Sequence, residues 1–242
     1  MVKKKKTLDT LVKDIYDKLD TLTEGKSLGV SDETATAFGE SMKEALLNWS
    51  AEHPVDKPTL RMSNIGKPNR QLWYDMHSKA KTKAFSAPVQ IKFLYGHILE
   101  EVVLFLARLA EHEVTSEQKE VNIDGIKGHM DCKIDGEVID IKTASSFAFR
   151  KFKEGTLPDD DPFGYMAQIA AYEESEGTDK GGFLTLNKEN GELTLFRPDE
   201  LDKPNIKARI KLLREQMKED TPPDFCYATI PDGKSGNMKL PR

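Results

Sequence analysis

The sequence predicts an α/β (α+β) fold in which helices flank a central mixed sheet. In several long segments, apolar residues recur every three or four positions, which is the period of a helix. Between residues 119 and 143 the period changes to two and β-branched residues become frequent, which is typical of strands. The predicted order is helices, three strands, helix, two strands and helix, and this order favours a sheet covered by helices.

The first sixty residues are expected to be helical. Residues 8–22 place leucine and isoleucine on one helical face, and Gly25 ends this helix. A second helix is predicted over 32–50, with Ser31 as its N-cap because a serine hydroxyl can accept an amide hydrogen of the first turn. A short helix should follow Pro68, and a long one should span about 88–114.

Three strands are then predicted as an antiparallel meander, over 119–123, 127–134 and 138–143. Asp124-Gly125 and Asp135-Gly136 supply the turns between them. The remaining predictions are a helix over 164–174, a hairpin of strands 183–187 and 192–197 around Asn190-Gly191, a helix over 206–218 and a loop-like end over 221–242.

The length of 242 residues fits one compact structural domain with appended segments. We expect an N-terminal helical region over 1–60, a core over 61–220 and a C-terminal loop or tail over 221–242.

Composition excludes several classes of protein. No run approaches the roughly 20 apolar residues that a membrane span needs, and no apolar stretch follows Met1 as in a secretory signal. Cys132 and Cys226 cannot build a disulfide framework or a four-cysteine cluster, so a cytoplasmic setting is expected. A formal net charge of −5, from 36 Lys+Arg against 41 Asp+Glu, at first argues against a nucleic-acid partner.

The residues that suggest chemistry lie on either side of the Asp135-Gly136 turn. Asp131 precedes the turn, and Asp140 and Lys142 follow it on the next predicted strand. Two carboxylates brought together repel each other unless a cation lies between them. Mg²⁺ takes one or two carboxylates together with water and substrate phosphate. Lys142 shares a strand face with Asp140, so the set suits metal-assisted hydrolysis of a phosphodiester.

A less specific interpretation is an ordinary salt bridge on a solvated strand face. The strand argues against it, because Asp140 lies among Val138, Ile139 and Ile141 and is expected to be buried. A buried charge needs a partner, and Asp131 gives a reason for the pair.

Asp131 together with Asp140-Ile141-Lys142 resembles the catalytic signature of the PD-(D/E)xK nuclease superfamily, whose restriction-endonuclease-like core is a mixed sheet flanked by helices. Further segments resemble its RecB-like and CRISPR-adaptation-nuclease-like exonuclease branch, including bacteriophage members. They are Gln168-x-x-x-Tyr172, the helix Gly96-His97-Ile98-Leu99-Glu100, and the stretch from Ser63 through Gly66 to Arg70-Gln71-Leu72-Trp73-Tyr74.

The resemblance implies a role for each of these residues. Glu100, Asp131 and Asp140 would bind Mg²⁺, with Mn²⁺ as a substitute, and the Ile141 carbonyl would be a further ligand. Glu101 competes with Glu100 as the helix ligand, and helical geometry alone does not separate them. Lys142 would assist attack. Gln168 and Tyr172 would shape the site and contact DNA, and Arg70 would hold a phosphate beside Ser63.

Some members of the branch carry an iron–sulfur cluster, with a cysteine just before the arginine that matches Arg70. Here that residue is Asn69, and the C-terminal cysteines of those members are reduced to Cys226. We therefore expect no iron–sulfur cluster.

Three weaker candidates come from the residues themselves. His97 and His129 could border the cleft or bind metal, and Arg150-Lys151 stands among phenylalanines, as strand-binding surfaces often do. Local cations then reconcile a DNA partner with the net charge, namely Arg61, Lys67, Arg70, Lys142, Arg150, Lys151 and Lys153.

The resulting hypothesis is an Mg²⁺-dependent DNA exonuclease that acts on linear duplex or single-stranded DNA with an end. The family suggests phage DNA replication, recombination or host DNA degradation in a bacterial host cytoplasm. A recombinase, an annealing protein or a single-strand-binding protein would be partners there. The alternatives are a structure- or sequence-specific endonuclease and a non-catalytic DNA-binding module that keeps the fold.

Overall fold

The centre of the protein is a five-stranded mixed sheet. The structure is a computed structural model of the chain and describes residues 6–51, 58–77, 85–225, 230–231 and 238–239. The strand order is β1-β4-β5-β6-β7, with β5 and β6 parallel and the other neighbours antiparallel. The predicted fold class is confirmed. The strands are β1 (Val114–Thr115), β4 (Cys132–Ile134), β5 (Glu137–Ala144), β6 (Gly181–Asn187) and β7 (Leu193–Phe196).

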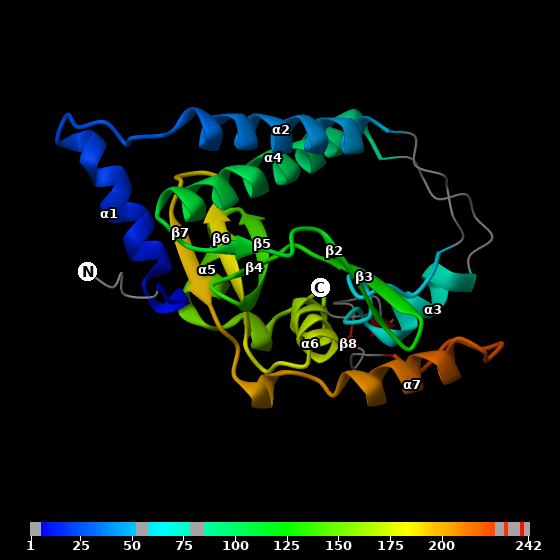
Figure 1. The fold of residues 1–242 in the computed structure, drawn as a ribbon. Coiled ribbons are helices and arrows are strands. Elements are labelled where there is room, and N and C mark those ends of the chain that lie inside the picture. The colour runs from blue at the N-terminus through cyan, green and yellow to red at the C-terminus, as the bar shows by residue number, and fades with distance from the viewer. Residues whose placement is uncertain (1–5, 52–57, 78–84, 226–229, 232–237, 240–242) are drawn as a thin grey trace.

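Helices cover both faces of this sheet (Figure 1). On one face, α1 (Leu11–Thr23) and α4 (Ala87–Leu109) share an apolar core with Ile139 and Ile141 of β5. On the other face, α6 (Tyr165–Glu176) and α7 (Ile206–Gln216) share a second core with Val138. The residues of β5 therefore alternate between two cores, as a strand covered on both faces requires.

The remaining helices lie around these two layers. The helix α2 (Asp32–Ser50) runs alongside α4 at the top of Figure 1 and has no buried residue. Ser31 caps it by accepting the Thr34 amide at 3.1 Å, as expected. The others are α3 (Asn69–His77), α5 (Ser146–Glu154) and the 3-10 turns η1 (Leu8–Thr10), η2 (Leu157–Asp159) and η3 (Glu200–Asp202).

The parallel pair β5–β6 is joined by a crossover through α5 and α6. The helix α5 is not among the predicted elements, and its buried Phe149 and Phe152 are three residues apart on one helical face. After β6, the chain turns back into β7 as the Asn190-Gly191 signal predicts, with Gly191 at φ 80°.

The predicted three-stranded meander is wrong in one respect. Its middle strand breaks at Asp131 into β3 (Ile126–Met130) and β4, and β2 (Lys119–Ile123) pairs only with β3 in a separate two-stranded sheet. The break has a physical cause, because the Asp131 carboxylate accepts the Ile141 amide at 2.7 Å and its carbonyl accepts the Gln118 amide.

The C-terminal segment is not entirely loop-like. β8 (Ile230–Pro231) pairs with β9 (Met238–Lys239) in a small antiparallel sheet. The division into segments 1–60, 61–220 and 221–242 stays a prediction. Within the described ranges, no helix is long and apolar enough to cross a membrane.

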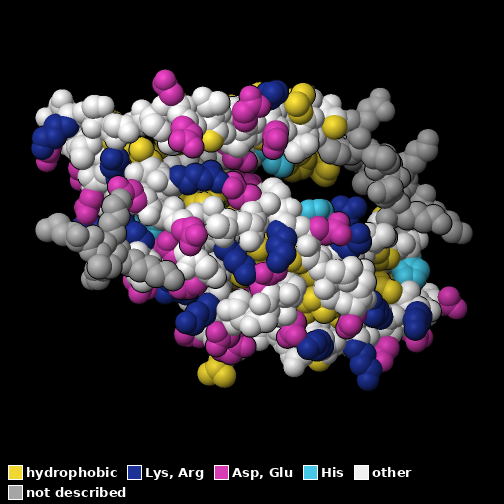
Figure 2. Space-filling model, viewed as in Figure 1, with side chains coloured by type: hydrophobic (Ala, Val, Ile, Leu, Met, Phe, Trp, Pro, Cys, Tyr) yellow, Lys and Arg dark blue, Asp and Glu magenta, His cyan; other side chains and the backbone are white. Residues whose placement is uncertain are grey.

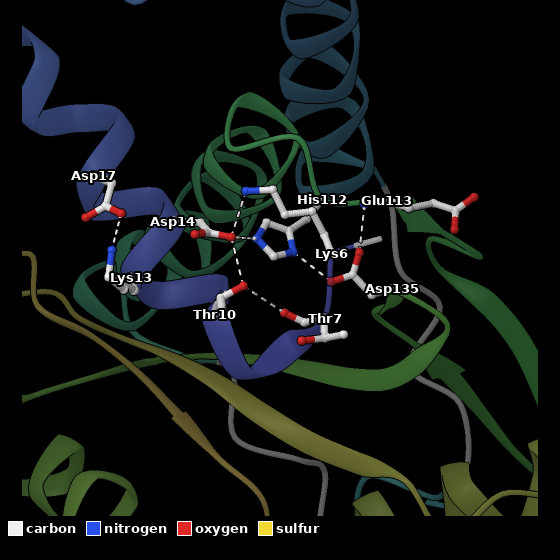
Figure 3. A network of polar contacts seen from close by, with 9 residues as sticks. All are labelled: Lys6, Thr7, Thr10, Lys13, Asp14, Asp17, His112, Glu113 and Asp135. Atoms are coloured by element: carbon white, nitrogen blue, oxygen red, sulfur yellow. Dashed lines mark hydrogen bonds and ion pairs between the residues drawn. The ribbon is translucent and has the colours of Figure 1, made fainter. Parts of the chain in front are cut away.

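A buried histidine joins the N-terminal helix to the sheet (Figure 3). His112 Nδ1 lies 2.7 Å from Asp135 Oδ2, and His112 Nε2 lies 3.2 Å from Asp14 Oδ2. Asp14 also accepts hydrogen bonds from Lys6 and Thr10, and Asp135 accepts the Glu113 amide. These contacts tie α1 to the end of α4 and to the β4–β5 turn.

Candidate functional site

The strand β5 carries the central pair of the site. Asp140 and Lys142 share a face with Val138, whose side chain belongs to the core beneath α6. Asp140 is fully buried, and its Oδ2 lies 2.5 Å from Lys142 Nζ. Its Oδ1 has no hydrogen-bond partner in the described part of the chain. A buried carboxylate oxygen left without a donor is costly, so this atom is available for a cation.

The Lys142 ammonium is held from three sides. Besides Asp140, it lies 3.4 Å from Gln168 Oε1 and 4.8 Å from the centre of the Tyr165 ring. The Lys142 side chain keeps 18% of its surface exposed. It can therefore reach a bound phosphate while its position is fixed from within.

Asp131 lies at the break between β3 and β4. Its Oδ2 accepts the backbone amide of Ile141, one residue after Asp140 on β5. The predicted approach of these two aspartates across the turn is thus present in the fold, and the aspartates are close enough for Asp140 to raise the pKa of Asp131.

Glu100, rather than Glu101, is linked to this pair through Gln118, whose backbone amide donates to the Asp131 carbonyl and whose side chain donates to Glu100. The pKa of Glu100 is raised to about 7 by burial, by Glu101 and by Asp140, and Lys142 partly opposes the shift. The Glu100 side chain accepts a hydrogen bond from Gln118 at 2.8 Å. The groups that act on the pKa of Glu101 are Ser41, Glu117, Arg108 and Glu44, none of which belongs to the site.

In this cluster, which consists of Glu100, Asp131, Asp140 and Lys142, three acids share one ammonium group. Burial raises the pKa of Asp131 well above its usual value, and Asp140 and Glu100 add to the shift. Burial also raises the pKa of Asp140, although Lys142 opposes this. Burial alone would lower the pKa of Lys142, but Asp140 and Asp131 outweigh it and raise the value. These raised pKa values favour protons on the acids, and a divalent cation bound among them would take the place of those protons.

The donor set fits a hard divalent ion. Carboxylate oxygens are its preferred ligands, and the unpartnered Asp140 Oδ1 is one of them. Among the described residues, no group of three or more His, Cys, Asp and Glu side chains is gathered closely enough to hold a metal. The three acids are therefore not arranged as a complete ligand set in this structure, and an ion at Asp140 would take further ligands from water and substrate oxygens.

The helix α6 packs against the sheet beside the site and positions its side chains through Gln168 and Tyr172. Gln168 Nε2 donates to the Tyr172 hydroxyl at 3.0 Å, and that hydroxyl donates to the His129 carbonyl at 2.7 Å. Gln168 thus connects Lys142 to the strand that ends before Asp131. Both side chains are buried, so they act by positioning in this structure, and their contact with DNA stays a prediction.

The segment after residue 60 packs against the start of α6. A Cβ on Gly66 would lie 2.4 Å from Gly164 Cα, so this approach requires glycine. Gly164 has φ +79°, which also favours glycine. Ser63 precedes Gly66 in the same segment, and its side chain is exposed to solvent.

Arg70 is engaged by the C-terminal segment. Its guanidinium donates to the Pro223 carbonyl at 2.5 Å and lies 4.3 Å from the centre of the Phe225 ring. The structure therefore does not present Arg70 as a free phosphate ligand. The sequence could not show this, because the two segments are about 150 residues apart.

The weaker candidates lie at the surface. His97 and Arg150 are exposed on α4 and α5. The His129 ring is exposed on β3, and Lys151 pairs with Asp160. Figure 2 shows this face hollowed between the helices along the top and the part below, with charged and histidine side chains at the border.

Sequence reasoning missed Tyr165, Phe163 and Gln118. Tyr165 lies three positions before Gln168 on α6, so helical spacing could have placed it on the same face. Phe163 and Gln118 carry no comparable signal, because they come from irregular segments. Cys132 is buried in the core, and Cys226 lies outside the described residues. The absence of an iron–sulfur cluster stays a prediction.

No model of a protein family matches this chain, and no curated protein matches it. Several solved structures are similar to this chain, among them the following three. The crystal structure of SSO0001 is 18% identical, with 79% of this chain and 89% of that chain covered and a TM-score of 0.38. The alkaline exonuclease LHK-Exo from Laribacter hongkongensis is 16% identical, with 64% and 89% covered and a TM-score of 0.42. The complex of LHK-Exo with dAMP is 15% identical, with 65% of this chain and 90% of that chain covered and a TM-score of 0.40. With TM-scores this low, the assignment of the site depends on the residues alone.

Proposed function

We propose that this protein is an Mg²⁺-dependent deoxyribonuclease that removes nucleotides from DNA ends. The observation that carries the proposal is the buried Asp140 on β5, whose Oδ1 has no partner among the described residues and which stands beside Lys142 and near two further acids. A purely structural ion pair would not need the additional carboxylates.

In this proposal Asp140, Asp131 and Glu100 hold the metal, with the Ile141 carbonyl as a further ligand and Mn²⁺ as a substitute. A metal held by these residues would supply an activated water and neutralise charge on the phosphate. Lys142 donates from its ammonium to the attacking oxygen or to the phosphate, which stabilises the charge that develops during attack. Gln168 and Tyr165 keep that ammonium in place.

The setting is proposed from the family resemblance alone. It comprises phage DNA replication, recombination or host DNA degradation in a bacterial cytoplasm. A recombinase, annealing protein or single-strand-binding protein would work alongside the nuclease there.

The test is digestion of end-labelled linear DNA in Mg²⁺ by the wild type, Lys142→Ala and Lys133→Ala. Lys133 is a matched control, because it lies on the neighbouring strand β4, is 23% exposed and pairs with Glu176 at 2.6 Å. We expect Lys142→Ala to lose about 10²–10³-fold in rate, as when a single donor to developing charge is removed. Lys133→Ala should stay within about threefold of the wild type, since Lys133 pairs with Glu176 on α6 and not with Asp140.

Closed circular DNA separates the enzyme classes, because an exonuclease needs an end. Cleavage of circles at the rate of linear DNA would replace the exonuclease by an endonuclease. Tight DNA binding without any hydrolysis would favour a binding module. Full activity of Lys142→Ala would remove Lys142 from the mechanism.

A further inference from the structure

An aromatic pair extends outward from the Lys142 ammonium. The Tyr165 ring lies 4.8 Å from Lys142 Nζ, and the Phe163 ring stacks on Tyr165 with a centroid distance of 5.4 Å and an interplanar angle of 26°. Phe163 is 59% exposed, although it is a large apolar side chain beside a charged site. We propose that Phe163, supported by Tyr165, is a stacking platform for an unpaired nucleobase of the DNA strand next to the bond that is cleaved.

The backbone turn that carries Phe163 is held in place before any ligand arrives. The Asp161 carboxylate accepts the Gly164 amide at 2.9 Å and the Met166 amide at 2.8 Å, so it brackets the turn that carries Phe163. The close approach of Gly66 to Gly164 fixes the same turn from the other side. A platform that is already ordered loses little conformational entropy on binding, which favours affinity.

The chemistry of the surroundings points to a base. An aromatic face binds any nucleobase by stacking, while a nearby cation attracts the phosphate of the same nucleotide. The exposed pair Phe85–Phe93 differs, because its rings meet edge to face at 86°, with Phe93 on α4 and Phe85 just before that helix. Inside a duplex both faces of a base are covered by its neighbours, and at a blunt end only the outer face of the terminal pair is free. An unpaired base can turn its face toward Phe163 without that constraint, so the platform favours an unpaired base.

The inference rests on the proposed function, since it assigns the substrate's form at the same site. It predicts that a single-stranded or frayed end is preferred over a blunt end. It also predicts that Phe163, rather than the charged cluster, causes the preference for single-stranded or frayed ends.

The test uses a single-stranded oligonucleotide with 2-aminopurine at its end, titrated in EDTA so that no hydrolysis occurs. Stacking quenches the fluorescence of this base. The wild type and Phe163→Trp should quench it. Phe163→Ala and Phe163→Leu should bind about tenfold more weakly with little quenching, because leucine keeps the apolar volume but lacks a ring face. Phe85→Ala is the matched control, as Phe85 is also 59% exposed, and it should behave as the wild type.

A second oligonucleotide that is abasic at the end identifies the contact. On this substrate, the wild type and Phe163→Ala should bind equally. Two results would overturn the proposal that Phe163 is a stacking platform. One is quenching by Phe163→Leu as strong as by the wild type, and the other is a loss of binding by Phe163→Ala on the abasic strand equal to its loss on the 2-aminopurine strand. If quenching by Phe163 is found but no DNA is degraded, the nuclease proposal fails alone. If DNA is degraded and Phe163→Ala quenches as the wild type, the platform fails alone.

Discussion

The protein contains two buried clusters of acids, one around His112 and one around Lys142. The two clusters differ in how many of their polar atoms have a hydrogen-bond or ion-pair partner. In the histidine cluster, which consists of Asp14, His112 and Asp135, both ring nitrogens have a carboxylate partner and both carboxylates have further donors. In the Glu100–Asp131–Asp140–Lys142 cluster, acids outnumber the single ammonium, and Asp140 Oδ1 has no partner among the described residues.

This difference distinguishes a cluster that stabilises the fold from a cluster that is suited to catalysis. A buried charge that serves the fold is stabilised only when its hydrogen bonds are complete, because each missing partner costs free energy. A buried charge that serves catalysis must keep an atom available for metal or substrate. The histidine cluster meets the first condition, and the cluster on β5 meets the second.

The largest expected effect comes from matched amide substitutions in the two clusters. Asp140→Asn should reduce hydrolysis of linear DNA by about 10³-fold or more, because the metal loses a charged ligand. The melting temperature should stay unchanged or rise, since burial raises the pKa of Asp140 and disfavours its carboxylate. Asp135→Asn should keep its activity but melt at a lower temperature. The comparison fails if Asp140→Asn melts lower than Asp135→Asn.

The next effect is on stability. His112→Ala should lower the free energy of unfolding by about 3 kcal/mol, because it leaves the Asp135 and Asp14 carboxylates without their imidazole partner. Urea unfolding measures the change. A loss below about 1 kcal/mol would mean that water replaces the imidazole and that the cluster does not anchor α1.

The smallest effect is a dependence on pH. The folded pKa of Glu100, about 7, lies above its ordinary 4.5. Its contribution to stability is therefore complete below pH 4.5 and is lost as the pH rises through 7. The melting temperature should fall by a few degrees between pH 5 and 8, and Mg²⁺ should restore it at pH 8.

Glu100→Gln and Glu101→Gln are the matched pair for this measurement. Glu100→Gln should remove most of the restoration by Mg²⁺, and Glu101→Gln should keep it, because Asp140 acts on the pKa of Glu100 and not on that of Glu101. An equal loss in both variants would contradict the assignment of Glu100 as the helix ligand.

The sequence predicted most of the regular elements, because their apolar periodicity is local. The Asp140–Lys142 pair was predictable for the same reason, since two residues on one strand share a face. The break at Asp131 was not, because it depends on a hydrogen bond to Ile141 across the β4–β5 turn. The engagement of Arg70 by Pro223 and the place of Tyr165 beneath Lys142 likewise depend on long-range packing.

The contact between Gly66 and Gly164 has a consequence for mutational scanning. Any side chain at either position meets the backbone of the other, so a scan would score both as intolerant to every substitution. An activity screen alone would then rank two residues without functional groups beside Asp140 and Lys142. Abundance of the folded protein, scored in parallel, would separate the glycine pair, which sets the distance between two segments, from the side chains that act on the substrate.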